Sequence, residues 1–105
     1  MHSYFFLSYF FGGAFLANAQ PHLINGISGS AYQTPFAKPR GKGLSSSTVN
    51  ILWGFFNLAA AYLLIIRVGS FSLHNIPQVL AVGAGMLLIS LLLARAFGRL
   101  HGGRI

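Results

Sequence analysis

Few residue types in this chain can carry acid–base chemistry. The chain contains no Asp, Glu or Cys, and the side chains that titrate near neutral pH are His2, His22, His74 and His101. Paired carboxylates, carboxylate-bound metal ions and thiolate nucleophiles are therefore excluded. A histidine base would have no carboxylate to orient it. The sequence predicts a protein that is not an enzyme and that holds no cofactor and no metal ion.

A stripe of small and polar residues could pack against another helix or line a pore. Asn50, Gly54, Asn57 and Ala61 recur at intervals of three and four residues, so they share one face of a helix. As a packing seam, the stripe would let two backbones approach closely while the Asn amides hydrogen-bond across the interface. Alternatively, Asn50 and Asn57 line a pore. Small and polar stripes in membrane helices are mostly seams, so the packing interpretation is favoured.

The seven charged residues are all basic, and six of them fall into two groups. Those six are Lys38, Arg40, Lys42, Arg95, Arg99 and Arg104. Such groups are typical of contacts with anionic lipid headgroups or with an acidic partner surface. Nucleic-acid binding is not expected, because the charges are few and spread over separate segments.

Three apolar segments must position these residues, at about 4–20, 50–66 and 76–94. Apolar types make up 54% of the 105 residues and charged types only 7%, unlike a typical soluble domain. Each segment is free of charge and close to the roughly 20 residues that span a bilayer. Backbone groups in hydrocarbon must pair within their own segment, which favours helices. We expect an all-α integral membrane protein, a single domain of residues 1–105 with three transmembrane helices.

The connection at about 21–49 is longer than usual between bundle helices. Pro21 is expected to end the first helix, and Asn25-Gly26 to form a turn. His22 would then contact the carbonyls of that helix end. Apolar residues of the connection, such as Tyr32 and Phe36, indicate that it lies partly on the membrane. Residues 45–47, all Ser, can cap the second helix, Pro77 fits the first turn of the third, and residues 95–105 form a basic tail.

Orientation follows from the distribution of charge. With three spans, the 21–49 connection and the tail lie on one face and carry six basic residues, whereas Arg67 alone lies opposite. The positive-inside rule makes the first face cytoplasmic and puts the N-terminus outside, as in a bacterial inner membrane. An apolar run ending in Ala17-Asn18-Ala19 also resembles a secretory signal peptide. Cleavage there would place all six basic residues outside, so an uncleaved helix is favoured.

Other side chains of the spans have simpler expected roles. Tyr4 and Tyr9 are expected at the outer interface, and Gln78 near the outer surface in contact with water. The Phe residues of the first segment form an aromatic face that could contact a pigment, a quinone, another protein or only lipid.

Two functions are consistent with this pattern. The favoured one is a small, non-enzymatic inner-membrane protein that serves as an accessory or assembly subunit, with other membrane helices and anionic lipids as partners. The alternative is a homo-oligomeric channel or carrier for an anion, a neutral solute or a lipid, because a path without acidic residues would disfavour cations.

Overall fold

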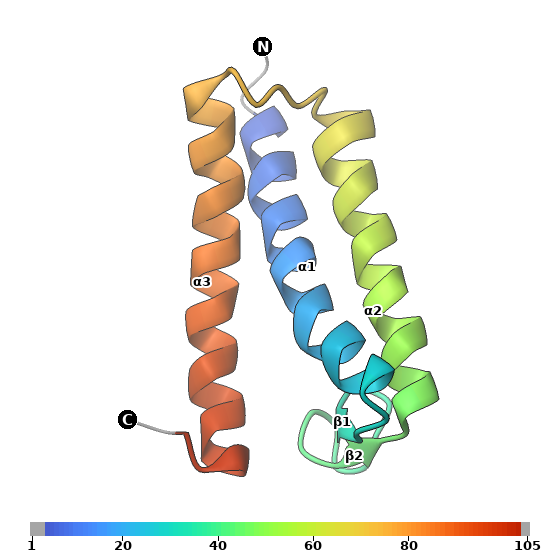
Figure 1. The fold of residues 1–105 in the computed structure, drawn as a ribbon. Helices are drawn as coiled ribbons and strands as arrows, with labels where there is room; N and C mark the ends of the chain where they lie inside the picture. Colours follow the sequence, from blue (N-terminus) through green and yellow to red (C-terminus); the bar gives the residue numbers. More distant parts are fainter. Residues whose placement is uncertain (1–3, 104–105) are drawn as a thin grey trace.

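The computed structural model describes residues 4–103 and consists of three long helices with a small hairpin at one end (Figure 1). The helices are α1 (Tyr4–Ile27), α2 (Ser47–Tyr62) with its π-helical continuation η1 (Leu63–Val68), and α3 (Ile76–His101). The hairpin pairs β1 (Tyr32–Gln33) antiparallel with β2 (Leu44–Ser45), so that Tyr32 lies opposite Ser45. The predicted predominance of helices is confirmed, and the short hairpin in the connection between α1 and α2 was not predicted.

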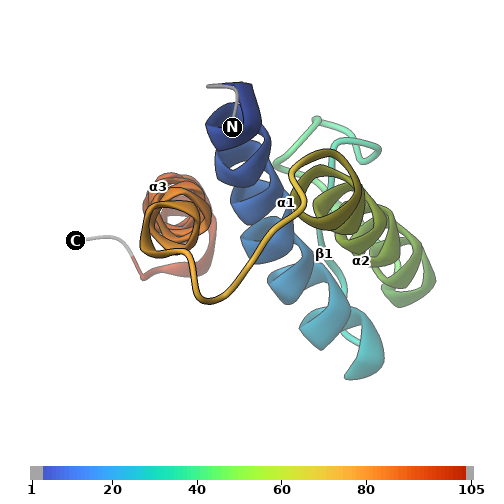
Figure 2. The same ribbon diagram turned by 90° about the horizontal axis from the view of Figure 1, so that it is seen from above.

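Helix α1 is the centre of the molecule. It lies between α2 and α3 and packs along both of them, while α2 and α3 barely touch one another (Figure 2). Its buried positions are mostly small or polar: Ser8, Tyr9, Gly12, Gly13, Ala17, Ala19, His22 and Gly26. The described structure therefore has no wide apolar core, and its interior is formed by the two seams of α1.

Two helices in the described part of the chain are long and apolar enough to cross a membrane. They are the continuous helix Ser47–Val68 and the helix Ile76–His101. Three helices of this length and apolar character were predicted, and these two confirm the prediction in part. Helix α1 falls short in apolar character, because Asn18, Gln20 and His22 interrupt its second half.

The first helix is longer than predicted, because Pro21 lies inside it and does not end it. Proline in a helix removes one backbone hydrogen bond, but neighbouring helices can hold the chain in place. Beyond Pro21, the side chain of His22 is buried and that of Asn25 donates to the Pro21 carbonyl at 2.7 Å. Gly26 packs against Ile51 of α2. The expected turn at Asn25-Gly26 is wrong for the same reason: contacts with α2 continue the helix.

The third helix also extends further, to His101, so that Arg95 and Arg99 lie in a helix instead of a tail. Ala, Arg and Leu in this segment are strong helix formers, which hydropathy alone does not register. The helix ends at Gly102, which has a φ of 81° suited to glycine. Pro77 lies in its first turn, as expected, and Asn75 is its N-cap.

The connection between α1 and α2 covers residues 28–46 and is shorter than the predicted 21–49. It contains the hairpin and ends at Ser46, whose hydroxyl accepts the Val49 N–H at 3.2 Å. The expected serine cap of the second helix is thus confirmed.

Glycines set the spacing between α1 and its neighbours. A Cβ at Gly13 would overlap the carbonyl of Val82, and a Cβ at Gly85 would overlap that of Phe10, so α1 and α3 approach backbone to backbone. On the other side, a Cβ at Gly54 would lie 2.7 Å from the Leu23 side chain. Close approach of this kind is how helices gain packing contacts where hydrophobic burial contributes little.

Candidate functional site

The small and polar stripe of α2 faces α1. Asn50, Gly54, Asn57 and Ala61 are the buried residues of α2, and both Asn side chains are 0% exposed. Asn57 Oδ1 accepts a hydrogen bond from Asn18 of α1 at 2.9 Å, and Asn57 Nδ2 donates to the Trp53 carbonyl at 2.7 Å. The stripe therefore lies in a seam within one chain, where its amides have partners.

Asn50 connects three parts of the molecule. Its Nδ2 carries two hydrogens and lies within hydrogen-bond distance of the carbonyls of Tyr32 at 3.2 Å, Ser45 at 3.2 Å and Ser46 at 3.0 Å, which anchors both hairpin strands to α2. Its Oδ1 lies 2.8 Å from Nδ1 of His22. Because Asn50 Oδ1 can only accept, His22 Nδ1 must carry the proton. In the neutral imidazole, Nε2 is then an acceptor.

The expected contact of His22 with the carbonyls at the end of α1 is wrong, because α1 continues past His22. The ring instead turns to α2 and the hairpin, where it packs edge-on to Tyr32 with centroids 5.6 Å apart. Twenty-eight residues separate His22 from Asn50, so the pairing depends on how α1 and α2 align.

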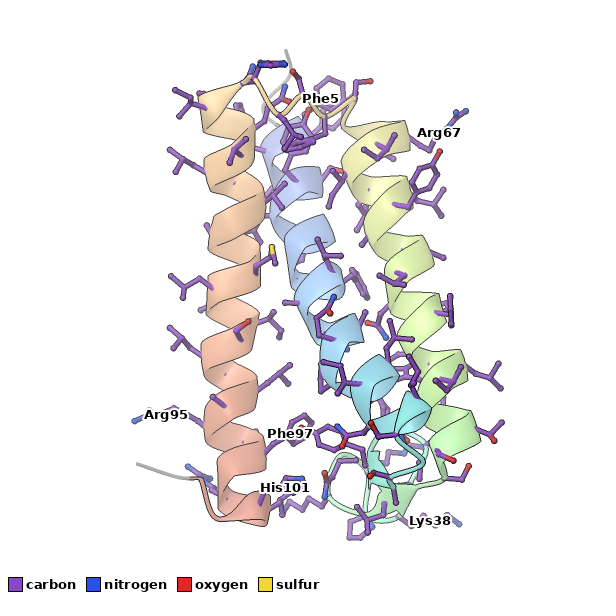
Figure 3. The ribbon with its side chains drawn as sticks, viewed as in Figure 1. Phe5, Lys38, Arg67, Arg95, Phe97 and His101 are labelled. Atoms are coloured by element: carbon purple, nitrogen blue, oxygen red, sulfur yellow. The ribbon has the colours of Figure 1, made fainter. Side chains whose placement is uncertain are left out.

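The end of α3 closes onto the hairpin. His101 stacks on Tyr32 with centroids 5.2 Å apart and an interplanar angle of 13°. Its Nε2 lies 2.7 Å from Oε1 of Gln33, and Phe97 packs edge-on to Tyr32 at 5.2 Å. Figure 3 shows Phe97 and His101 pointing from α3 toward the hairpin. Burial raises the pKa of Tyr32.

The basic residues divide between the two ends of the molecule. Lys38, Arg40 and Lys42 lie in the connection that holds the hairpin, and Arg95 and Arg99 lie in the part of α3 nearest to it. Arg67 lies in η1, at the opposite end (Figure 3). Arg104 and His2 are outside the described residues. The five described basic residues near the hairpin are exposed.

The opposite end of the bundle is held by polar contacts that the sequence did not predict. The Tyr9 hydroxyl donates to the Gly69 carbonyl, and the Ser8 hydroxyl donates to the Leu64 carbonyl. Tyr9 is fully buried, so its hydroxyl bonds the protein backbone at this end of the bundle. Gln78 is only 4% exposed and its Oε1 accepts the Ser72 N–H at 2.8 Å. Its expected contact with water is wrong, because it fixes the turn before α3.

Cavities in the described part of the chain include three with walls from α1. The first, here called the aromatic cleft, measures about 400 Å³, and residues lining it include Phe10, Phe11, Phe15, Trp53, Leu88 and Leu92. The second, here called the polar pocket, measures about 350 Å³, and residues lining it include Asn18, His22, Thr34, Arg40, Trp53 and Phe97. The third, here called the outer cavity, measures about 640 Å³, and residues lining it include Leu16, Tyr62, Ile65, Phe71, Val79 and Met86.

Metal ligation has no geometric basis in residues 4–103. No group of three His, Cys, Asp or Glu residues comes together there. His22 and His101 both approach Tyr32, but each ring already has an amide partner.

Several residues of these sites were missed by sequence reasoning. Asn18 pairs with Asn57, Trp53 lines both the aromatic cleft and the polar pocket, and Tyr32 and Gln33 bind the end of α3. One signal was present: Ala14, Asn18 and His22 are spaced by four residues, which places two polar groups on one face of α1. The strands β1 and β2 have two residues each, which is too short for a periodic pattern in the sequence.

Comparison with protein-family models, with curated proteins and with solved structures finds no match to this chain. The function is therefore inferred from the geometry of the chain itself.

Proposed function

We propose that this chain is a small integral membrane protein with three spanning helices, which serves as a non-enzymatic accessory or assembly subunit of a larger membrane complex. One observation carries the membrane assignment: the apolar helices face outward. Only 28% of the most apolar stretch of Ser47–Val68, and 11% of that of Ile76–His101, is buried within the chain. A core helix of a soluble protein would be mostly buried. Outward apolar faces suit lipid or other membrane helices.

Helix α1 is proposed as the third span. Its 24 residues would extend about 36 Å at 1.5 Å per residue, more than the roughly 30 Å of bilayer hydrocarbon. Polar side chains in such a span must find partners inside the protein. Asn18 pairs with Asn57 and His22 with Asn50, and both α2 partners are fully buried. These pairs support insertion of α1 between the other two helices.

The proposed orientation places the hairpin end in the cytoplasm. Five described basic residues lie at that end and Arg67 at the other, and the positive-inside rule assigns the first face to the cytoplasm of a bacterial inner membrane. The N-terminus is then outside and the C-terminus inside. The basic rim would hold the connection and the end of α3 against anionic headgroups.

A non-enzymatic, partner-binding role is supported by residue chemistry and by the exposed faces. The chain has no carboxylate side chain and no thiol, so a histidine base would lack the usual orienting acid. Large apolar side chains are exposed along the outer faces of α2 and α3, among them Leu52, Phe56, Leu80 and Leu91. A partner subunit with an apolar helix can pack on these faces.

The test is purification of the natural protein from membranes in a mild detergent, followed by native mass measurement. The proposal predicts that alkaline carbonate leaves the protein in the membrane, and that it purifies with at least one other membrane protein. Recovery as a single chain would contradict the subunit role. A homo-oligomer that passes solute in reconstituted vesicles would support the channel alternative instead.

A further inference from the structure

The aromatic cleft and the polar pocket adjoin along α1, and together they are here called the groove. They share Asn18 and Trp53 as walls. On α1, Phe10, Ala14, Asn18 and His22 recur at intervals of four residues and line the groove in turn. Twelve residues of helix at 1.5 Å each give it a length of about 18 Å. This is close to the hydrocarbon of one leaflet, half of roughly 30 Å.

The chemistry of the groove changes along its length. The aromatic cleft is lined by Phe, Leu and Ile side chains and suits a hydrocarbon chain. The polar pocket contains Arg40, His22 and Thr34, and it lies at the end of the bundle where the basic residues collect. Helices α2 and α3 lie on either side of α1 and barely touch each other (Figure 2). A molecule that enters the groove from the plane of the membrane would therefore not have to separate them.

The polar pocket offers donors and a positive charge that the described residues leave unused. Thr34 bonds Ser45 at 2.5 Å and Gln33 bonds His101, so these groups are occupied. The Arg40 guanidinium has no acidic side chain to pair with, since the chain contains no Asp or Glu. The indole N–H of Trp53 has no hydrogen-bond partner among residues 4–103. A guanidinium presents five donors that match phosphate oxygens.

We propose that this groove binds one anionic membrane lipid, with its phosphate at Arg40 and one acyl chain in the aromatic cleft. The inference rests on the proposed insertion of the chain into a membrane, and it goes further by defining a single built site. The lipid comes from the leaflet at the hairpin end, where Arg40 meets the headgroups. The outer cavity is larger, but its lining is apolar, so it would take any acyl chain without selecting a headgroup.

Trp53 provides the measurement, because it is the sole Trp of the chain and lines both parts of the groove. The protein is placed in phosphatidylcholine vesicles that contain increasing fractions of phosphatidylglycerol brominated on its acyl chains. Brominated phosphatidylcholine serves as the neutral comparison. Half-maximal quenching of Trp53 is expected at about a fivefold lower mole fraction of the anionic lipid, the preference that one basic residue near the headgroups supplies.

Matched variants separate the site from general surface charge. Arg40→Gln should remove the preference for phosphatidylglycerol, whereas Lys38→Gln, the same loss of charge in the same connection, should retain it. Arg40→Lys should keep part of it, because the charge stays but the planar fork is lost. Leu88→Phe, which fills the aromatic cleft, should reduce quenching by both lipids, while Val79→Phe in the outer cavity should not.

Several results would overturn the proposal. One is equal quenching by the two lipids in the unmodified protein, and another is equal loss of preference in Arg40→Gln and Lys38→Gln. Relief of quenching by inorganic phosphate at constant ionic strength would show that the head binds without the acyl chain, which also contradicts the site. A chain that fails to enter vesicles would contradict membrane insertion itself, whereas a chain that inserts and shows no preference would remove only the lipid site.

Discussion

Helices α1 and α3 are similar in length, 24 and 26 residues, but their surroundings are opposite. Helix α1 lies between two helices and buries small and polar residues, including Ser8, Asn18 in part, and His22. Helix α3 contacts α1 along one narrow face, with Gly85 as its closest approach, and exposes its Leu side chains. The difference shows that, in this fold, the helix with the most polar groups is central and the most apolar helix is peripheral. Lipid accepts apolar surface readily, so polar groups are the ones that need a protein partner.

The largest expected effect is on the seam that joins these two helices. Gly13→Leu should lower the free energy of unfolding by about 3 kcal/mol or more, because the obstacle to the new side chain is the backbone carbonyl of Val82. Gly83→Leu on α3 is the matched control, since nothing lies within 4 Å of a Cβ there, and should change it by less than about 0.5 kcal/mol. Unfolding by titration with a denaturing detergent measures both. Similar losses of unfolding free energy in the two variants would contradict the central position of α1 in the bundle.

The next effect concerns Asn50, the residue that joins α1, α2 and the hairpin. Asn50→Leu should cost about 2–3 kcal/mol, since it removes the bond to His22 and the side-chain donor to the Tyr32 and Ser45 carbonyls, while the Ser46 carbonyl still accepts the backbone N–H of residue 50. Amide hydrogen exchange in residues 32–45 should accelerate together with the loss of stability. Asn25→Leu is the control, because that side chain bonds only a carbonyl of its own helix. Amide hydrogen exchange in residues 32–45 that is as slow in Asn50→Leu as in the unmodified protein would mean that contacts other than those of Asn50 hold the hairpin.

A smaller effect is expected at the Asn18–Asn57 pair. Asn57→Leu should cost about 0.6 kcal/mol, the average for a hydrogen bond between membrane helices. A double-mutant cycle with Asn18→Leu isolates the pair, and the coupling should account for most of that cost. A coupling energy of zero would contradict the hydrogen bond between Asn18 and Asn57. A coupling energy above about 2 kcal/mol would indicate a larger hydrogen-bond network than the structure contains.

The smallest effect is expected on the outer face of α3. Leu91 is exposed, and Leu91→Ala should change stability in a bilayer by less than about 0.5 kcal/mol, because lipid replaces the lost contact. Native mass measurement of the same variant sharpens the comparison. Loss of a partner subunit without loss of stability would identify this face of α3 as the subunit interface.

Local signals in the sequence predicted the existence of the helices and two of their starts. The Ser run before α2 and the Asn75-Ile76-Pro77 sequence before α3 act within one turn, so no tertiary information was needed. The continuation of α1 beyond Pro21 could not be predicted, because it depends on His22 meeting Asn50, 28 residues away. The groove was missed for the same reason, since its walls come from α1, α2, α3 and the connection.

The central claim, that α1 crosses the membrane between two more apolar helices, can be tested by labelling single cysteines, because the chain has none of its own. Ser3→Cys, Ser30→Cys and Ser72→Cys place one thiol before α1, one after it and one between η1 and α3. An impermeant thiol reagent added outside intact cells should label the variants at positions 3 and 72 and spare the one at position 30. Positions 3 and 30 labelled alike, and unlike position 72, would mean that α1 does not cross and would contradict the account.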